Sequence, residues 1–113
     1  MYDPDKRKLL SAISHGAIFF STTLVSVGIP IAVLFVSDDP IVKENAKEAI
    51  NFHLNVWFWA LVIGVLVTIS FGLLFPLAGL GFLIHWGLTI LAIVKVFSHP
   101  DESFRYPFIV RLL

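Results

Sequence analysis

Long apolar runs separated by short polar interruptions dominate this chain. The apolar runs cover residues 9–36, about 52–71 and 77–97. About 20 consecutive apolar residues are enough for an α-helix to cross the hydrocarbon core of a bilayer. The pattern therefore predicts an all-α, polytopic integral membrane helical bundle. We expect one domain over residues 1–113, with a bent or hairpin first element followed by two long helices.

The second apolar run begins as an amphipathic helix. Asp39 is a good N-cap and Pro40 suits the first helical position, so we predict one long helix near 40–71. Residues 40–51 are its charged entry, and the membrane span follows. A helical spacing places four polar side chains on one line, with one lysine on its flank: Glu44, Glu48, Asn51 and Asn55, with Lys47. Polar groups at membrane depth need partners. The line is therefore expected to be a solvated face whose Asn side chains bond neighbouring helices, and the alternatives are a polar path within an assembly and a docking surface for a partner protein.

The first apolar run, residues 9–36, allows two topologies. It could form one tilted span, or it could bend near Ser26–Pro30 and return to the side on which it began. The hairpin places every Lys and Arg on one face of the membrane and leaves only the uncharged 72–76 turn on the other. The positive-inside rule therefore favours the hairpin, with the Lys- and Arg-bearing loops in the cytoplasm. The third run, 77–97, is a span, and residues 98–113 form an interfacial tail.

The composition of the chain argues against several classes of function. The chain is 58% hydrophobic and only 14% charged, whereas soluble proteins carry about 25% charged residues. Its formal net charge is zero, which gives no case for binding nucleic acid. It has no cysteine, which excludes disulfides, thiol catalysis and cysteine-bound metal clusters. We find no nucleophile–base set or phosphate-binding loop, so we predict a protein that is not an enzyme and has no metal or cofactor.

Small residues recur every four positions along the second apolar run. This helix-packing stripe consists of Ala60, Gly64, Thr68 and Gly72. Such a stripe lets another helix approach closely. We expect it to pack against residues 77–97, and self-association into a homo-oligomer is the alternative.

Three histidines and six interfacial side chains complete the candidate set. His15, His53 and His85 lie in or beside apolar runs, where a hydrogen-bonding role is expected and ligation of a metal or tetrapyrrole is the alternative. No pair has the spacing of a known metal motif. The expected interfacial anchors are Trp57, Trp59, Lys95, Arg105, Tyr106 and Arg111. We also expect Glu48 to pair with Arg105 or Arg111 and so tie the tail to the amphipathic entry.

Several of these positions form a combination that resembles a known family. The matching segments are Ser14-His15-Gly16, the stretch from Asn45 to His53, and Tyr106-Pro107 followed by Ile109-Val110-Arg111. They resemble a small bacterial and cyanobacterial membrane-protein family grouped with the twenty-kilodalton inner-envelope component of the chloroplast protein-import translocon. The resemblance implies four helices, a link to protein transport, and importance for Lys47, Glu48, Asn51, Phe52, Tyr106 and Arg111.

Our leading functional interpretation is a non-enzymatic subunit of a larger membrane assembly, either translocon-like or accessory. Its expected partners are the lipid bilayer and other membrane-protein subunits. The expected host is a bacterial plasma membrane or a cyanobacterial or plastid membrane. One alternative is a homo-oligomeric channel or transporter for a small solute, with Asn51, Asn55 and His85 along the path. The other is a cofactor-binding subunit of a photosynthetic or respiratory complex that uses the histidines.

Overall fold

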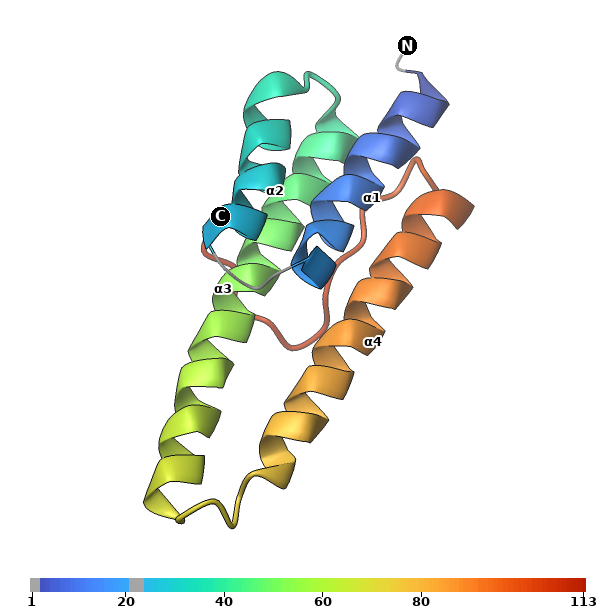
Figure 1. Ribbon diagram of the computed structural model, residues 1–113. Coiled ribbons are helices and arrows are strands. Elements are labelled where there is room, and N and C mark those ends of the chain that lie inside the picture. The colour runs from blue at the N-terminus through green and yellow to red at the C-terminus, as the bar shows by residue number, and fades with distance from the viewer. Residues whose placement is uncertain (1–2, 21–23) are drawn as a thin grey trace.

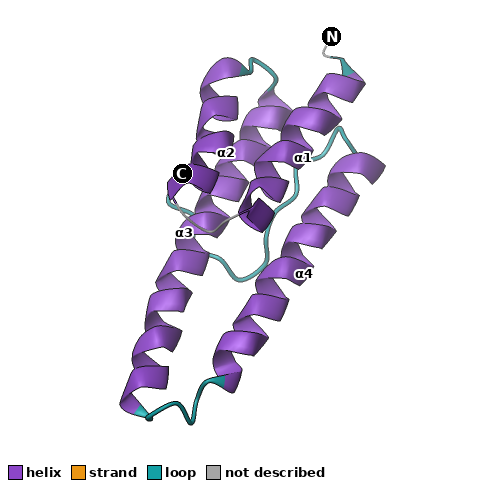
Figure 2. Ribbon diagram, viewed as in Figure 1, coloured by secondary structure: helices purple, strands orange, loops and turns teal. Residues whose placement is uncertain are grey.

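The computed structural model describes residues 3–20 and 24–113 and contains four α-helices in this part of the chain. They are α1 (Pro4–Phe20), α2 (Leu24–Val36), α3 (Pro40–Ile69) and α4 (Pro76–Ser98), as Figures 1 and 2 show. The predicted all-α class is confirmed. The apolar run 9–36 holds α2 and most of α1, which pack against each other, so it is not one continuous span. The bend expected near Ser26–Pro30 is wrong, because both residues lie within α2.

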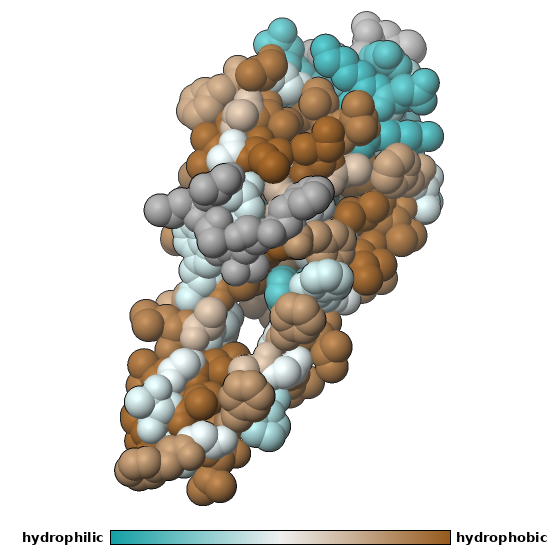
Figure 3. All heavy atoms as spheres, in the orientation of Figure 1, coloured by the Kyte–Doolittle hydropathy of each residue, from teal (hydrophilic) through white to brown (hydrophobic). Residues whose placement is uncertain are grey.

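The molecule is elongated, with extents of 55 × 24 × 22 Å, and has two unequal parts. One part, which we call the head, contains α1, α2, the first half of α3, the end of α4 and the C-terminal tail (Figure 1). The other part is the lower hairpin, in which α3 and α4 continue alone to the turn at 70–75. Figure 3 shows hydrophilic side chains gathered at the far end of the head and mostly apolar ones over the lower hairpin.

Local sequence signals set the ends of the long helices. The Asp39 side chain accepts a hydrogen bond from the Ile41 amide at 3.0 Å, so it caps α3 as predicted. Helix α3 ends at Ile69, because Phe71 and Gly72 take positive φ angles of 55° and 89°. Glycine adopts this left-handed conformation without steric cost, and α4 then starts at a proline.

Both long helices are long and apolar enough to cross a membrane. Residues 49–94 contain no Asp, Glu, Lys or Arg. The lower hairpin exposes large apolar side chains, among them Leu61, Leu73 and Leu83. Such a surface would be costly in water but suits hydrocarbon, so the chain is a membrane protein whose head lies at one end of its spans.

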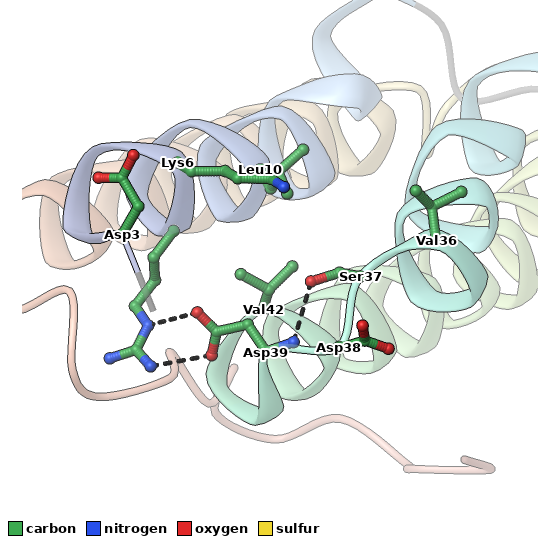
Figure 4. A pocket seen from close by; sticks show the side chains of 9 residues that line it. Asp3, Lys6, Leu10, Val36, Ser37, Asp38, Asp39 and Val42 are labelled. Carbon is green, nitrogen blue, oxygen red and sulfur yellow. Dashed lines mark hydrogen bonds and ion pairs between the residues drawn. The ribbon is translucent and has the colours of Figure 1, made fainter. Parts of the chain in front are cut away.

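A single arginine joins three segments at the far end of the head. Arg7 on α1 donates to both carboxylate oxygens of Asp39, at 2.7 and 2.9 Å, and to Asp101 beyond α4 at 2.7 Å. Figure 4 shows the Asp39 contacts beside the small pocket between α1 and the segment before α3. Burial alone would raise the pKa of Asp39, but the bonds from Arg7 and from the Ile41 amide together lower it. Both groups therefore stay charged, and α1 is held against the start of α3.

The small-residue stripe does not pack against residues 77–97, as we had expected, and its self-association stays a prediction. Ala60, Gly64 and Thr68 are exposed, and a Cβ at Gly64 would meet nothing within 4 Å among the described residues. Helix α4 approaches α3 elsewhere, where a Cβ at Gly81 would lie 3.2 Å from the Ile63 side chain. Gly72 belongs to the turn and not to the stripe.

Candidate functional site

The polar line of α3 is covered by the chain's own tail. Helix α4 ends at Ser98, and residues 103–113 form a segment without helix or strand, with a turn at 107–108, that runs back along the amphipathic half of α3. Oxygens of α3 side chains accept hydrogen bonds from tail amides in four places: Asn45 from Phe104 at 3.1 Å, Glu48 from Tyr106 at 2.9 Å, Asn55 from Val110 at 3.0 Å, and Asn51 from Leu112 and Leu113 at 3.0 and 3.1 Å. The partner predicted for the polar line is therefore intramolecular.

These contacts provide hydrogen-bond partners for the backbone amides of the tail. An extended segment has no internal hydrogen-bond ladder, and unpaired backbone amides are costly away from water. The Asn and Glu side chains accept hydrogen bonds from the tail amides, as the carbonyl oxygens of a neighbouring β-strand would. Asn55 also donates through Nδ2 to the carbonyl of Val110 at 2.7 Å, so one side chain pairs both the backbone N–H and the backbone C=O of Val110. We call this set of contacts the tail clamp.

One ion pair closes the tail clamp. Arg111 donates to the two oxygens of Glu48 at 3.0 and 2.9 Å through Nε, and its Nη2 lies 2.7 Å from Oε1. Nη2 also donates to the carbonyl of Tyr106 at 2.6 Å. We expected Glu48 to pair with Arg105 or Arg111. It pairs with Arg111, and Arg105 is exposed. Arg111 is therefore part of the clamp and not an interfacial anchor.

Tyr106 is also not an interfacial anchor, because it is only 1% exposed. Its ring stacks on Phe52 of α3, with centroids 4.0 Å apart and planes within 2° of parallel. It forms the head core with Ile18, Phe52 and Ala92. Burial, followed by the nearby charge of Glu48, raises the pKa of Tyr106 well above its ordinary value. The phenol therefore keeps its proton and can donate it in a hydrogen bond.

That hydrogen bond goes to His15. The Tyr106 hydroxyl lies 2.7 Å from His15 Nδ1, and His15 Nε2 lies 2.7 Å from Asn45 Oδ1. The Asn45 Nδ2 group donates to Ser11 and to the Ile41 carbonyl, so its oxygen is the acceptor and His15 Nε2 carries the proton. Burial lowers the pKa of His15 to about 4, which keeps the ring neutral. Both of its nitrogens are occupied, so His15 has no nitrogen left for a cofactor.

Asn45 was not predicted from the sequence, although it is central. Its oxygen accepts from both His15 and the Phe104 amide. The available signal was its position three residues before Glu48, on the same side of the helix. Asn45 thereby links α1, α3 and the tail.

The remaining predicted residues lie at the edges of this network. Glu44 accepts from the Ser103 hydroxyl at 2.8 Å, whereas Lys47 is exposed. His53 contacts α2 through Ser26, and Trp57 packs edge-on against its ring. Trp59 is exposed, and Lys95 and His85 are half-buried on α4. The interfacial role of Trp57, Trp59, Lys95 and Arg105 stays a prediction.

The arrangement is suited to holding structure and not to conducting a solute. We expected Asn51 and Asn55 along a polar path, but their side chains accept hydrogen bonds from the tail. Within the described residues, no group of three or more His, Asp or Glu side chains is placed to hold a metal ion. Of the three side chains expected along a solute path, Asn51 and Asn55 bond the tail, and the channel alternative stays a prediction.

A comparison with known protein families identifies the family to which this chain belongs. The model of the magnetosome magnetite crystal formation protein family, MamF/MmsF, matches residues 6–113. The chain belongs to the MamF/MmsF family. The match covers α1 to α4 and the tail, so this membrane protein belongs to a family involved in magnetite crystal formation. Neither a curated protein nor a solved structure matches the chain.

The expected membership in a family related to the chloroplast import translocon is therefore wrong, and the link to protein transport goes with it. The structure explains why the motif misled. The residues that carried the resemblance, including Glu48, Asn51, Tyr106 and Arg111, build the tail clamp. These residues stabilise the fold of this chain, and their contacts give no information on a transported substrate.

We predict that Arg111→Ala destabilises the head by about 2 kcal/mol, because it leaves the Glu48 carboxylate largely buried without its cation. Arg105→Ala is the matched control, since Arg105 is exposed on the same tail, and we expect a change within about 0.5 kcal/mol. Thermal unfolding of both variants in detergent measures the difference. Equal stability of the two variants would show that the tail clamp does not hold the head.

Proposed function

We propose that this MamF/MmsF chain is a non-enzymatic subunit of a larger assembly in the magnetosome membrane. The observation that carries the proposal is the separation of charge. All eight acidic and all eight basic residues lie within residues 3–8, 38–48 and 95–111, which belong to the head. The two spans anchor the chain, and the head presents the only charged surface with which it can contact other components.

The use of the buried polar groups supports a structural role. Glu48 and Arg111 bond each other and the tail, and His15 is bonded at both nitrogens. A catalytic group must reach a substrate, whereas these groups are committed to the fold. The exposed groups of the head, such as Lys43 and Lys47, are suited to contacts with other components.

The lower hairpin supports a place in an assembly. Ala60, Gly64 and Thr68 give α3 an outward face of small side chains, and small side chains allow a second helix to approach closely in a membrane. Another subunit or a second copy of the chain would fit this face. Both belong to the same proposal of an assembled state.

We further propose that the head lies on the cytoplasmic side, since every Lys and Arg lies at that end. The chain contains no cysteine, so single cysteines at Glu102 and at Leu73 report the two sides directly. With intact magnetosome vesicles, a membrane-impermeant maleimide should label Glu102→Cys and spare Leu73→Cys until detergent is added. Labelling of Leu73→Cys alone would reverse the orientation.

The role itself is tested by complementation in a magnetosome-forming bacterium that lacks the gene. We expect the deletion to shift the distribution of magnetite crystal sizes in electron micrographs. A subunit acts in proportion to its amount, so recovery should rise with expression of the wild-type chain. Arg105→Ala should restore the distribution, and Arg111→Ala at matched protein level should not. Full recovery at a few per cent of the native amount would indicate turnover and would contradict a subunit role.

A further inference from the structure

Helices α1 and α2 pack against each other, and we call them the α1–α2 pair. Between residues 9 and 37 they contain no Asp, Glu, Lys or Arg. Ser14 and Ser26 in this range are buried, whereas Ile13 is exposed and Phe35 is 82% exposed. A protein surface in water usually has the reverse pattern, because large exposed apolar patches are costly there. The outer face of the α1–α2 pair therefore suits hydrocarbon, as the surface of the lower hairpin does.

Contacts with the two long helices show how far the α1–α2 pair extends along the spans. The Ser26 hydroxyl of α2 lies 3.4 Å from Nε2 of His53 on α3. The Phe19 ring of α1 lies beside the Trp86 ring of α4, with centroids 4.5 Å apart. His53 and Trp86 both belong to the stretch 49–94, which has no charged side chain. The α1–α2 pair therefore lies beside the part of α3 and α4 that crosses the membrane.

The depth that the α1–α2 pair reaches corresponds to one leaflet. Trp86 lies nine residues before Lys95, the first charged residue of α4, which is about 14 Å along a helix. Half of the hydrocarbon core is about 15 Å thick. Figure 1 shows α1 and α2 beside the head end of the long helices, with α3 and α4 alone near their turn. Within the described residues, four helices thus occupy the leaflet on the head side, and two helices occupy the other leaflet.

We propose that this shape makes the chain a wedge that prefers a strongly curved membrane, with its head in the convex leaflet. Over any patch of a small vesicle, the outer leaflet has more area than the inner leaflet. A protein that is wider in the outer leaflet fits there without compressing the lipids. The binding partner of the outer face of the α1–α2 pair is the acyl-chain layer of that leaflet, and contacts of this kind are sensitive to curvature.

The proposal goes beyond the subunit role and does not rest on it, because a single chain already has this shape. Purified chains in vesicles of pure lipid test the wedge, whereas complementation in cells tests the subunit role. The two proposals can therefore fail separately. Neutral phosphatidylcholine is the lipid of choice, since it removes attraction between the charged head and anionic lipid.

The first test measures sorting by vesicle size. The full chain carries a fluorescent maleimide at Glu102→Cys, an exposed position of the head, and is reconstituted at low density into phosphatidylcholine vesicles of mixed diameter. Microscopy of single vesicles gives the protein density per membrane area. We expect a density at least about threefold higher in vesicles about 50 nm across than in vesicles about 400 nm across. Equal density at all diameters would overturn the proposal.

Orientation distinguishes a wedge from a general preference for loosely packed lipid. A wedge fits only with its wide end on the convex side, so most chains in small vesicles should have the head outside. In large vesicles the two orientations should approach equal numbers. A membrane-impermeant quencher added outside the vesicles measures the fraction of heads outside. Sorting into small vesicles with equal numbers of both orientations would contradict the wedge.

A spin label tests the position of the α1–α2 pair. A Cβ at Gly28 of α2 would meet nothing within 4 Å among the described residues, so Gly28→Cys leaves room for a nitroxide. This label should collide with oxygen, which dissolves in hydrocarbon, and should be shielded from a water-soluble nickel complex. Lys43→Cys is the matched control, because Lys43 is exposed in the charged part of α3, and its label should show the reverse. Equal access of the nickel complex to both labels would place the α1–α2 pair in water and would overturn the proposal.

Discussion

The structure depends on one constraint, which is that an extended tail at the edge of a membrane must have its backbone amides paired. Helix α3 meets this constraint with side chains, since Asn45, Glu48, Asn51 and Asn55 accept from the tail. The same contacts bury Tyr106 on Phe52 and place its hydroxyl on His15. Without the tail, a line of polar groups would enter the bilayer without partners, which is costly. The tail and the polar line therefore stabilise each other.

The division into head and lower hairpin follows from this arrangement. In the head, α1, α2 and the tail surround the polar half of α3, and Arg7 joins three segments at the far end. In the lower hairpin, α3 and α4 expose apolar side chains that suit hydrocarbon. A membrane protein of the magnetite-forming family thus carries its charged surface at one end of two spans. This one-sided surface supports the role that we propose within an assembly.

The sequence was sufficient for the fold class and for the capped start of α3, because hydropathy and caps act locally. It also placed Glu44, Glu48, Asn51 and Asn55 on one line and offered Arg111 as a partner of Glu48. It could not show that the partner of the whole line is the tail, because a short segment without periodicity, such as 103–113, gives no signal of where it docks.

Other features depended on tertiary packing. The small side chains of Ala60, Gly64 and Thr68 are evident from the sequence. Whether they face another helix or the outside depends on how α3 packs in the folded chain. Tyr106 looked like an interfacial anchor because tyrosine is common at membrane surfaces, yet ring stacking and a buried hydrogen bond hold it in the core. The buried Nε2 of His85, which has no hydrogen-bond partner among the described residues, could not be predicted from the sequence, because it depends on how α4 packs.

Amide hydrogen exchange of the tail, resolved by residue in detergent micelles, tests the tail clamp most directly. The account predicts that the amides of Phe104, Tyr106, Val110 and Leu112 exchange slowly, because oxygens of α3 accept from them. The amides of Arg105 and Phe108, to which α3 offers no such acceptor, should exchange faster. Uniformly fast exchange along residues 103–113 would show that the tail is not bound to α3 and would contradict the account.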